Sequence, residues 1–214
     1  MKQFVILVVA LSTISFIAGY GLSSVYNMTK EPIEKQNKIV EDAAKKEVLP
    51  EAVTFEDAVL NTESVYAYST YWVGKDANGI VVGYVAKVHK QGYSSDIKTI
   101  VGFKTDGSIT AIKIIEQSET PGLGTKCQEI VIDKKTQKPV MWFQEQYRNL
   151  KTGTNGTIDV IKGTVPAGTN GISAITASTI SSKAITDSIN NGVKDIMNDI
   201  VAKMPVETKK EGTK

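Results

Sequence analysis

The chain has 214 residues, a formal net charge of +2, one cysteine and one histidine. This length accommodates one domain with a hydrophobic core and an appendage. A single thiol excludes an intrachain disulfide framework and a protein-only iron–sulfur or zinc–thiolate site, and a single histidine excludes a histidine metal cluster. The near-neutral charge argues against a nucleic-acid partner. We therefore expect no metal site and no catalytic residue, so any redox chemistry would come from a cofactor.

Residues 1–29 are expected to form a transmembrane anchor. No charged residue occurs from Gln3 to Thr29, and most side chains in the first part of this run are aliphatic. Roughly 20 such residues in a helix cross a bilayer core of about 30 Å. A cleaved signal peptide is the alternative, with Gly19-Tyr20-Gly21 as its cleavage site. The single lysine at the start and the continuation of the apolar run to Tyr26 favour a retained single span.

The segments that flank the folded part are charged. Residues 30–50 alternate in charge with apolar residues at helical spacing, which predicts a membrane-proximal helix that ends before Pro50 and acts as a linker. Residues 203–214 have too little apolar surface to fold and are expected to be a disordered tail. The N-terminus is expected in the cytoplasm, which places the domain on the extracytoplasmic side of the cell membrane.

Residues 51–202 are expected to form one α+β domain. Four stretches have strand patterns, the first with alternating aromatic side chains, and short turns at residues 75–79 and 106–107 join neighbours. Strands joined by short turns are antiparallel, which predicts an antiparallel sheet meander with flanking helices. Further on, residues 151–171 indicate a loop or an edge hairpin around residues 157–162. The four expected strands are residues 65–72, 80–88, 97–103 and 109–115.

The stretch Ile172–Thr186 combines hydroxyl side chains with the start of a helix. An N-terminal helix end carries unpaired backbone N–H groups and the positive end of the dipole, so it favours an anion. On composition alone, an ordinary serine or threonine N-cap is the more common case. The apolar stripe expected for the helix comprises Ile180, Ala184, Ile185, Ile189, Val193, Ile196, Met197 and Ile200.

The sequence Thr176-Ala177-Ser178-Thr179 at the start of this helix resembles the flavin-attachment segment of the FMN-binding domain family. In that family, a segment Asp-x-x-Ser/Thr-Gly-Ala-Thr carries FMN esterified through its phosphate to the last threonine. The ungapped alignment makes Thr179 the acceptor, with Ser178 and Thr176 as neighbouring competitors. Three residues differ from the common pattern: Ser173 stands where Asp is usual, Ala177 where Gly is usual, and Ser178 where Ala is usual.

Three further motifs resemble the same family and occur in the same order. They are Gly92-Tyr93-Ser94-x-x-Ile97, Glu119-Thr120-Pro121-Gly122-Leu123-Gly124 and Trp142-Phe143-x-x-Gln146-Tyr147. Taken alone, the Pro-Gly pair predicts a type II turn and the aromatic residues of the third motif predict core packing. Together with the attachment segment, the resemblance covers roughly residues 49–201.

The resemblance implies covalent FMN with its phosphate at the helix start and the turn at 120–124 close to the flat ring. Hydroxyls of Ser178, Ser181 and Ser182 are expected donors to the phosphate. Glu119 is a candidate for orienting the turn, and a solvated charge is its alternative interpretation. The expected cofactor-binding residues are Thr179, Thr176, Ser178, Ser181, Ser182, Glu119, Thr120, Gly122, Leu123 and Gly124.

The family includes the G subunit of Rnf ion-translocating complexes and the C subunit of the sodium-pumping NADH:quinone reductase. The resemblance implies an electron-carrier subunit of an Rnf-type ferredoxin:NAD oxidoreductase. The implied partners are the other membrane subunits, a flavin transferase and membrane lipid, with no nucleic acid. The alternatives are a C-type subunit of the quinone reductase, a stand-alone flavoprotein reductase partner, and a flavin-free membrane scaffold.

Overall fold

The structure is a computed structural model that describes residues 1–133 and 136–203. The chain divides into two compact units, residues 1–42 and the part from Ala43 onwards. Only Lys203 of the expected tail lies in the described part, as the last residue of a helix, and the remainder of that tail lies outside it.

The N-terminal unit consists of most of helix α1 (Lys2–Val48), and the end of the helix, from Ala43 onwards, belongs to the second unit. The helix is long and apolar enough to cross a membrane by length and composition. The membrane-proximal helix expected for residues 30–50 continues from the apolar segment without a break, with Pro32 inside it. It ends before Pro50, as expected.

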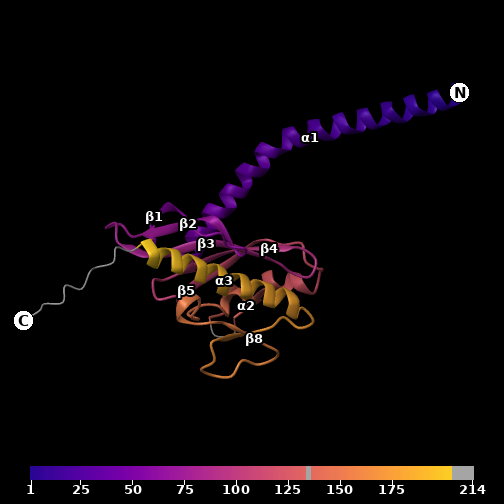
Figure 1. Cartoon of the computed structure of the whole chain (residues 1–214). Helices are drawn as coiled ribbons and strands as arrows, with labels where there is room; N and C mark the ends of the chain where they lie inside the picture. Colours follow the sequence, from indigo (N-terminus) through magenta and orange to yellow (C-terminus); the bar gives the residue numbers. More distant parts are fainter. Residues whose placement is uncertain (134–135, 204–214) are drawn as a thin grey trace, which may run out of the picture. The chain divides into compact units, whose positions relative to one another are not determined.

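The second unit is built on a five-stranded antiparallel sheet with strand order β1-β2-β3-β4-β5 (Figure 1). Neighbouring strands are also consecutive in sequence, so the predicted meander is confirmed. Strand β1 was not predicted, because its largely exposed side chains give no apolar alternation. The strands are β1 (Thr54–Val59), β2 (Ala67–Lys75), β3 (Val81–Gln91), β4 (Asp96–Phe103) and β5 (Ile109–Glu116).

Strand β2 differs from its expected pattern of one buried and one exposed face. The strand begins at Ala67, and its pairing with β3 shifts register between Ala67 and Tyr71. Tyr71 and Trp72, which are adjacent in sequence, are both buried. Side chains of adjacent strand residues point to opposite faces, so burial of both shows that the sheet is covered on both sides here.

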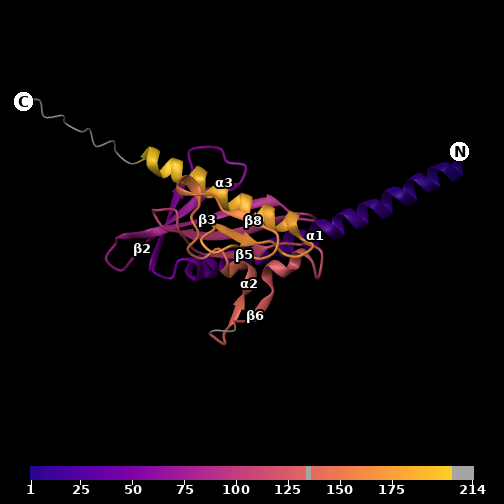
Figure 2. The ribbon, with the colours of Figure 1, turned by 90° about the horizontal axis from the view of Figure 1, so that it is seen from below.

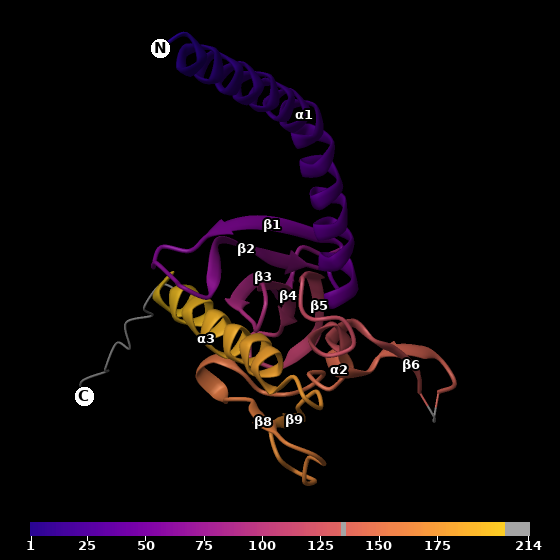
Figure 3. The same ribbon diagram turned by 90° about the vertical axis from the view of Figure 1, so that its right-hand side faces the viewer.

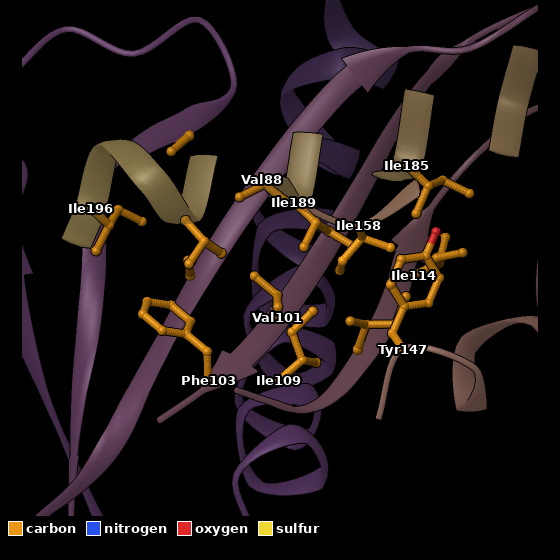
Figure 4. Packing of buried hydrophobic residues seen from close by; sticks show 14 of the residues in the cluster. Val88, Val101, Phe103, Ile109, Ile114, Tyr147, Ile158, Ile185, Ile189 and Ile196 are labelled. Atoms are coloured by element: carbon orange, nitrogen blue, oxygen red, sulfur yellow. The ribbon is translucent and has the colours of Figure 1, made fainter. Parts of the chain in front are cut away.

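Helix α3 (Thr179–Lys203) covers one face of the sheet and forms the main core with it (Figure 4). Its fully buried isoleucines, Ile185, Ile189 and Ile196, pack with strand residues such as Val88 and Phe103. The opposite face of the sheet carries a smaller core formed with the end of α1. That second cluster comprises Ala44, Val48, Leu49, Ala52, Trp72, Val85 and Ile100.

The prediction that Ile180 belongs to the buried stripe of α3 is wrong, because its side chain is 57% exposed. Ile180 precedes Ile185 by five residues, which at 3.6 residues per turn places it about 140° away around the helix axis. Ile185 points into the core, so Ile180 points away from it.

Between β5 and α3 the chain forms only short helices and strands (Figures 2 and 3). Phe143 and Tyr147 are fully buried, which confirms the core packing expected for them, whereas Trp142 is only partly buried at the edge of the same core. Of the two alternatives expected around residues 157–162, a loop or an edge hairpin, the hairpin is wrong, because the short strand β8 there pairs in parallel with β9; most of residues 151–171 form loops. These elements are η1 (Gly124–Gln128), β6 (Ile130–Ile132), β7 (Pro139–Met141), α2 (Trp142–Glu145), η2 (Gly153–Asn155), β8 (Asp159–Ile161) and β9 (Gly171–Ser173).

Candidate functional site

A cavity of about 650 Å³ lies between the β3–β4 loop, the turn before η1 and the first turn of α3. Its volume falls within the range typical of small-molecule and cofactor sites. It brings together expected site residues from segments about 60 residues apart in sequence. The lining residues are Tyr93, Glu119, Thr120, Leu123, Gly124, Ala177, Ser178, Thr179, Ile180 and Ser181.

Helix α3 presents its N-terminus to this cavity. The first N–H group to bond within the helix is that of Ser182, which donates to the Ser178 carbonyl at 3.0 Å. The N–H groups of Thr179, Ile180 and Ser181 therefore precede the helical ladder, and within the described residues none has a partner. The helix has 25 residues, and the positive end of its dipole coincides with these free donors. The arrangement suits a phosphate.

The turn that enters α3 is strained at one residue. The Ser178 N–H donates to the Ile175 carbonyl at 2.9 Å, and between them Ala177 has a φ of 62°. A positive φ is unfavourable for a residue with a Cβ atom and is readily adopted by glycine. The flavin-attachment segment that this stretch resembles usually has glycine at position 177. The positive φ of this residue explains that preference, because glycine adopts a positive φ without strain.

Replacing Ala177 by Gly is expected to stabilise the domain by roughly 0.5–1 kcal/mol, because the relief of the left-handed strain exceeds the extra chain entropy lost by glycine. Chemical denaturation followed by circular dichroism measures the change. Ala174→Gly is the matched control: Ala174 lies just after β9 with no positive φ, so glycine there should destabilise. Equal effects at both positions would contradict the strain argument.

Three of the expected site residues lie outside the cavity lining. Ser182 is fully buried, and its hydroxyl donates to the Ser178 carbonyl at 3.0 Å and accepts from the Ile175 N–H at 2.9 Å. Thr176 is exposed on the turn before the helix. Gly122 has a φ of 74° in a turn that the Leu123 N–H closes onto the Thr120 carbonyl at 3.1 Å. Pro121 precedes this glycine, so the predicted type II turn is confirmed.

Glu119 is not a solvated charge, since it is 4% exposed. Its carboxylate accepts hydrogen bonds from the N–H groups of Tyr93 (3.2 Å), Ser94 (2.9 Å) and Ser95 (3.0 Å). It also accepts one from the Ser181 hydroxyl at 2.5 Å. The carboxylate thus joins the β3–β4 loop to the first turn of α3.

Burial of Glu119 raises the pKa of its carboxyl, but the hydrogen bonds from Ser181 and the three backbone N–H groups outweigh burial and hold the pKa below its usual value of 4.5. A depressed folded-state pKa gives stability that is present above the unfolded value and lost as the pH falls through the folded one. We expect the β3–β4 loop to lose its protection from amide exchange only in acid, below the usual carboxyl range. Amide exchange measured across a pH series tests this, and loss of protection near neutral pH would contradict it.

The donors and side chains of the cavity fit an FMN. The free N–H groups and the side chains of Ser178 and Thr179 could hold a phosphate at the helix start, and the exposed side chains of Tyr93, Leu123 and Ile180 would offer apolar surface to a flat ring. Among residues 1–133 and 136–203, no cluster of three or more His, Cys, Asp or Glu could hold a metal. The cavity therefore has the chemistry of a binding site for an organic anion with a flat apolar body.

Comparisons with known proteins agree with this chemistry. The FMN-binding domain family matches residues 92–194, which include the β3–β4 loop, the 119–124 turn and most of α3. Over 199 residues the chain is 33% identical to the G subunit of the Na(+)-translocating ferredoxin:NAD(+) oxidoreductase complex from Acetobacterium woodii, covering 88% of this chain and 89% of that relative. The chain belongs to the FMN-binding domain family. The G subunit of an ion-translocating oxidoreductase complex from Methanosarcina acetivorans is 27% identical over 90% of this chain and 94% of its own length.

Two solved structures share the fold. The C subunit of the Na(+)-translocating NADH-quinone reductase from Parabacteroides distasonis superposes with a TM-score of 0.55 at 17% identity, covering 78% of this chain and 95% of that one. The NqrC of Shewanella oneidensis gives a TM-score of 0.51 at 17% identity, over 72% of this chain and 73% of that one. The α+β fold expected from the sequence is confirmed.

Sequence reasoning did not assign three of the cavity-lining residues to the site. Tyr93 lies within a motif that was recognised, but its ring carried no assigned role. Ile180 was assigned to the core by its spacing, and Ala177 was noted only as a departure from the usual glycine. A finer calculation of helix angles would have placed Ile180 opposite the buried stripe.

Proposed function

We propose that this chain is the electron-carrying G subunit of a membrane-bound, ion-translocating ferredoxin:NAD oxidoreductase complex of the Rnf type, with FMN joined to Thr179 by a phosphoester. The observation that carries the proposal is the position of Thr179. Its part-exposed side chain lies in the wall of a cofactor-sized cavity, directly at the free N–H groups of α3. The similarity to G subunits over most of the chain supports the assignment to the complex.

The isoalloxazine ring of FMN exchanges one or two electrons, and the protein contributes binding, orientation and control of access. A phosphodiester keeps one negative charge, which the dipole of α3 and the N–H groups of residues 179–181 stabilise. Ser178, one residue before the helix, also lines the cavity. Leu123, Ile180 and Tyr93 exclude water from the ring. None of these roles requires a catalytic acid or base.

The proposed arrangement in the membrane uses α1. The apolar part, residues 1–29, would be retained as a single span, residues 30–50 would be a helical linker, and residues 51–202 would lie on the extracytoplasmic side. The length and composition of the helix support a span. Mass analysis of the mature protein tests retention, and a mature N-terminus near Leu22 would show instead that the segment is a cleaved signal.

Flavin content separates a flavin carrier from a flavin-free scaffold, and the subunits that co-purify separate the kinds of carrier. The full-length chain, produced together with a flavin transferase, should give a fluorescent band under ultraviolet light after denaturing electrophoresis. Its intact mass should equal that of the chain plus FMN minus water. A chain without flavin would support a membrane scaffold. Co-purification with a quinone reductase rather than with ferredoxin:NAD oxidoreductase subunits would support a C-type subunit.

A further inference from the structure

The carboxylate of Glu119 occupies a slot between two glycines. A Cβ atom at Gly92 would lie 2.7 Å from Oε1 of Glu119, and one at Gly124 would lie 2.7 Å from Oε2 and 2.6 Å from the Cβ of Glu119. Real Cβ atoms do not approach other atoms so closely, so the slot is open only because both residues lack side chains. The two glycines lie in different motifs, but both lie against the same buried carboxylate.

Three consecutive N–H groups, those of Tyr93, Ser94 and Ser95, converge on this carboxylate. Successive N–H groups that point to one place form a binding site for an anion, and here the anion is a side chain of the protein itself. The same segments have further ties, because the Ser95 hydroxyl accepts from the Ser118 N–H at 2.7 Å and Ser94 and Thr120 share a hydrogen bond of 3.2 Å. The backbone of the β3–β4 loop is therefore fixed at the cavity.

The side chain of Tyr93, on this fixed loop, does not pack in the core of the domain. Tyr93 is 70% exposed although its N–H is held by Glu119, and it lines the cavity together with exposed Leu123 and Ile180. An exposed aromatic ring on an anchored backbone loses little conformational freedom when it covers a flat ligand, and aromatic rings favour offset stacking.

We propose that Glu119 is a positioning residue: it holds the β3–β4 loop so that Tyr93 forms an aromatic wall of the cavity against the isoalloxazine ring. The part concerning the ring rests on the proposed function. Because Ser181 donates its hydroxyl proton to Glu119, that proton is not available to a phosphate. Ser178 lines the cavity and its hydroxyl makes no hydrogen bond within the described residues, so it is then the side-chain donor to the phosphate.

The first arm of the test needs no flavin. Glu119→Gln keeps the shape of the side chain but replaces one of its two acceptor oxygens by an NH₂ group. An NH₂ group cannot accept the hydrogen bonds that the loop's N–H groups donate. The background for this arm is the full-length Thr179→Ala chain in detergent. In it, we expect Glu119→Gln to make the amides of residues 93–95 exchange at least about 10-fold faster, which corresponds to about 1.4 kcal/mol of lost protection. Glu116→Gln is the matched control, because Glu116 is an exposed partner of Lys98 outside the cavity.

The second arm uses the flavin-carrying chain. A stacked tyrosine quenches flavin fluorescence, so Tyr93→Leu should raise the emission several-fold, whereas Tyr93→Phe should preserve the near-ultraviolet circular dichroism of a stacked ring. Glu119→Gln should raise the emission as Tyr93→Leu does, and the double variant should add nothing further, because both changes remove one contact. Gly92→Ala, which pushes the exposed loop away without altering the charge, should act like Glu119→Gln if the latter folds poorly.

The outcomes separate the two proposals. Unchanged exchange of residues 93–95 in both Glu119→Gln and Gly92→Ala would overturn the role of Glu119. Faster exchange with flavin emission unaffected by Tyr93→Leu would overturn the aromatic wall. A parent chain without flavin would remove the proposed function and the wall together, while the exchange arm would still decide whether Glu119 positions the loop.

Discussion

Thr179→Ala is expected to abolish the covalent flavin and to leave the domain folded. The methyl group of alanine offers no oxygen for the ester, so the loss should be complete rather than partial. The helix begins at residue 179, and the Thr179 hydroxyl makes no hydrogen bond within the described residues. We therefore expect the free energy of unfolding to change by less than about 0.5 kcal/mol, as for substitutions away from structural features. Intact mass and ultraviolet fluorescence of the denatured band measure the flavin.

Two neighbouring hydroxyls provide the controls for that experiment. Ser178→Ala and Thr176→Ala should both keep the flavin on the chain, since Ser178 is 7% exposed and Thr176 lies outside the cavity lining. Peptide mapping that finds FMN on either of them in the parent, or any flavin in the Thr179→Ala chain, would contradict the assignment.

Ser173 becomes the residue to examine if the parent carries no flavin despite a co-expressed transferase. It stands where the resembling segment has Asp, and its hydroxyl donates to the Gly163 carbonyl at 2.6 Å. Its N–H donates to the Gln146 side chain at 2.8 Å. An ionised Asp cannot donate to a carbonyl, so Ser173→Asp would release the loop at Gly163 and expose a carboxylate there.

The sheet was predictable because its signals are local. Glycine-containing turns at residues 75–79 and 106–107 mark where the chain reverses, and short turns require antiparallel neighbours. Strand β1 gave no such signal, since it is an edge strand with exposed side chains. The adjacent burial of Tyr71 and Trp72 follows from packing by α3 on one side and the end of α1 on the other, which a strand pattern does not contain.

The composition of the site was only partly predictable, because its contacts join distant segments. The bond between Ser181 and Glu119 spans 62 residues, and that between Ser94 and Glu119 spans 25. In sequence, Ser178, Ser181 and Ser182 are equivalent hydroxyls near a helix start. Their places in the fold separate them: the Ser182 hydroxyl bonds within the turn, the Ser181 hydroxyl bonds to Glu119, and Ser178, just before the helix, lines the cavity. The sequence identified the group of hydroxyls, and their partners required the fold.

The two isoleucines at the start of α3 are expected to respond very differently to truncation. Ile185 has no exposed surface and packs in the core between α3 and the sheet, as Figure 4 shows. Ile185→Ala removes buried methyl groups and leaves a cavity, which costs about 2–5 kcal/mol in comparable cores. That is a large share of the roughly 5–15 kcal/mol by which domains are stable, so the ratio of unfolded to folded variant should rise by about 30- to 5,000-fold.

Ile180→Ala, by contrast, should lower the free energy of unfolding by less than about 0.5 kcal/mol, because the side chain is 57% exposed and leaves no core cavity. Its effect should appear at the flavin instead, as a shift of the absorption band when an apolar wall of the ligand cavity is removed. Urea denaturation of both full-length variants in detergent, with the flavin spectrum recorded on the folded protein, separates the two roles. Comparable destabilisation by both substitutions would mean that Ile180 belongs to the core after all, and that the apolar side of the cavity is built from Leu123 and Tyr93 alone.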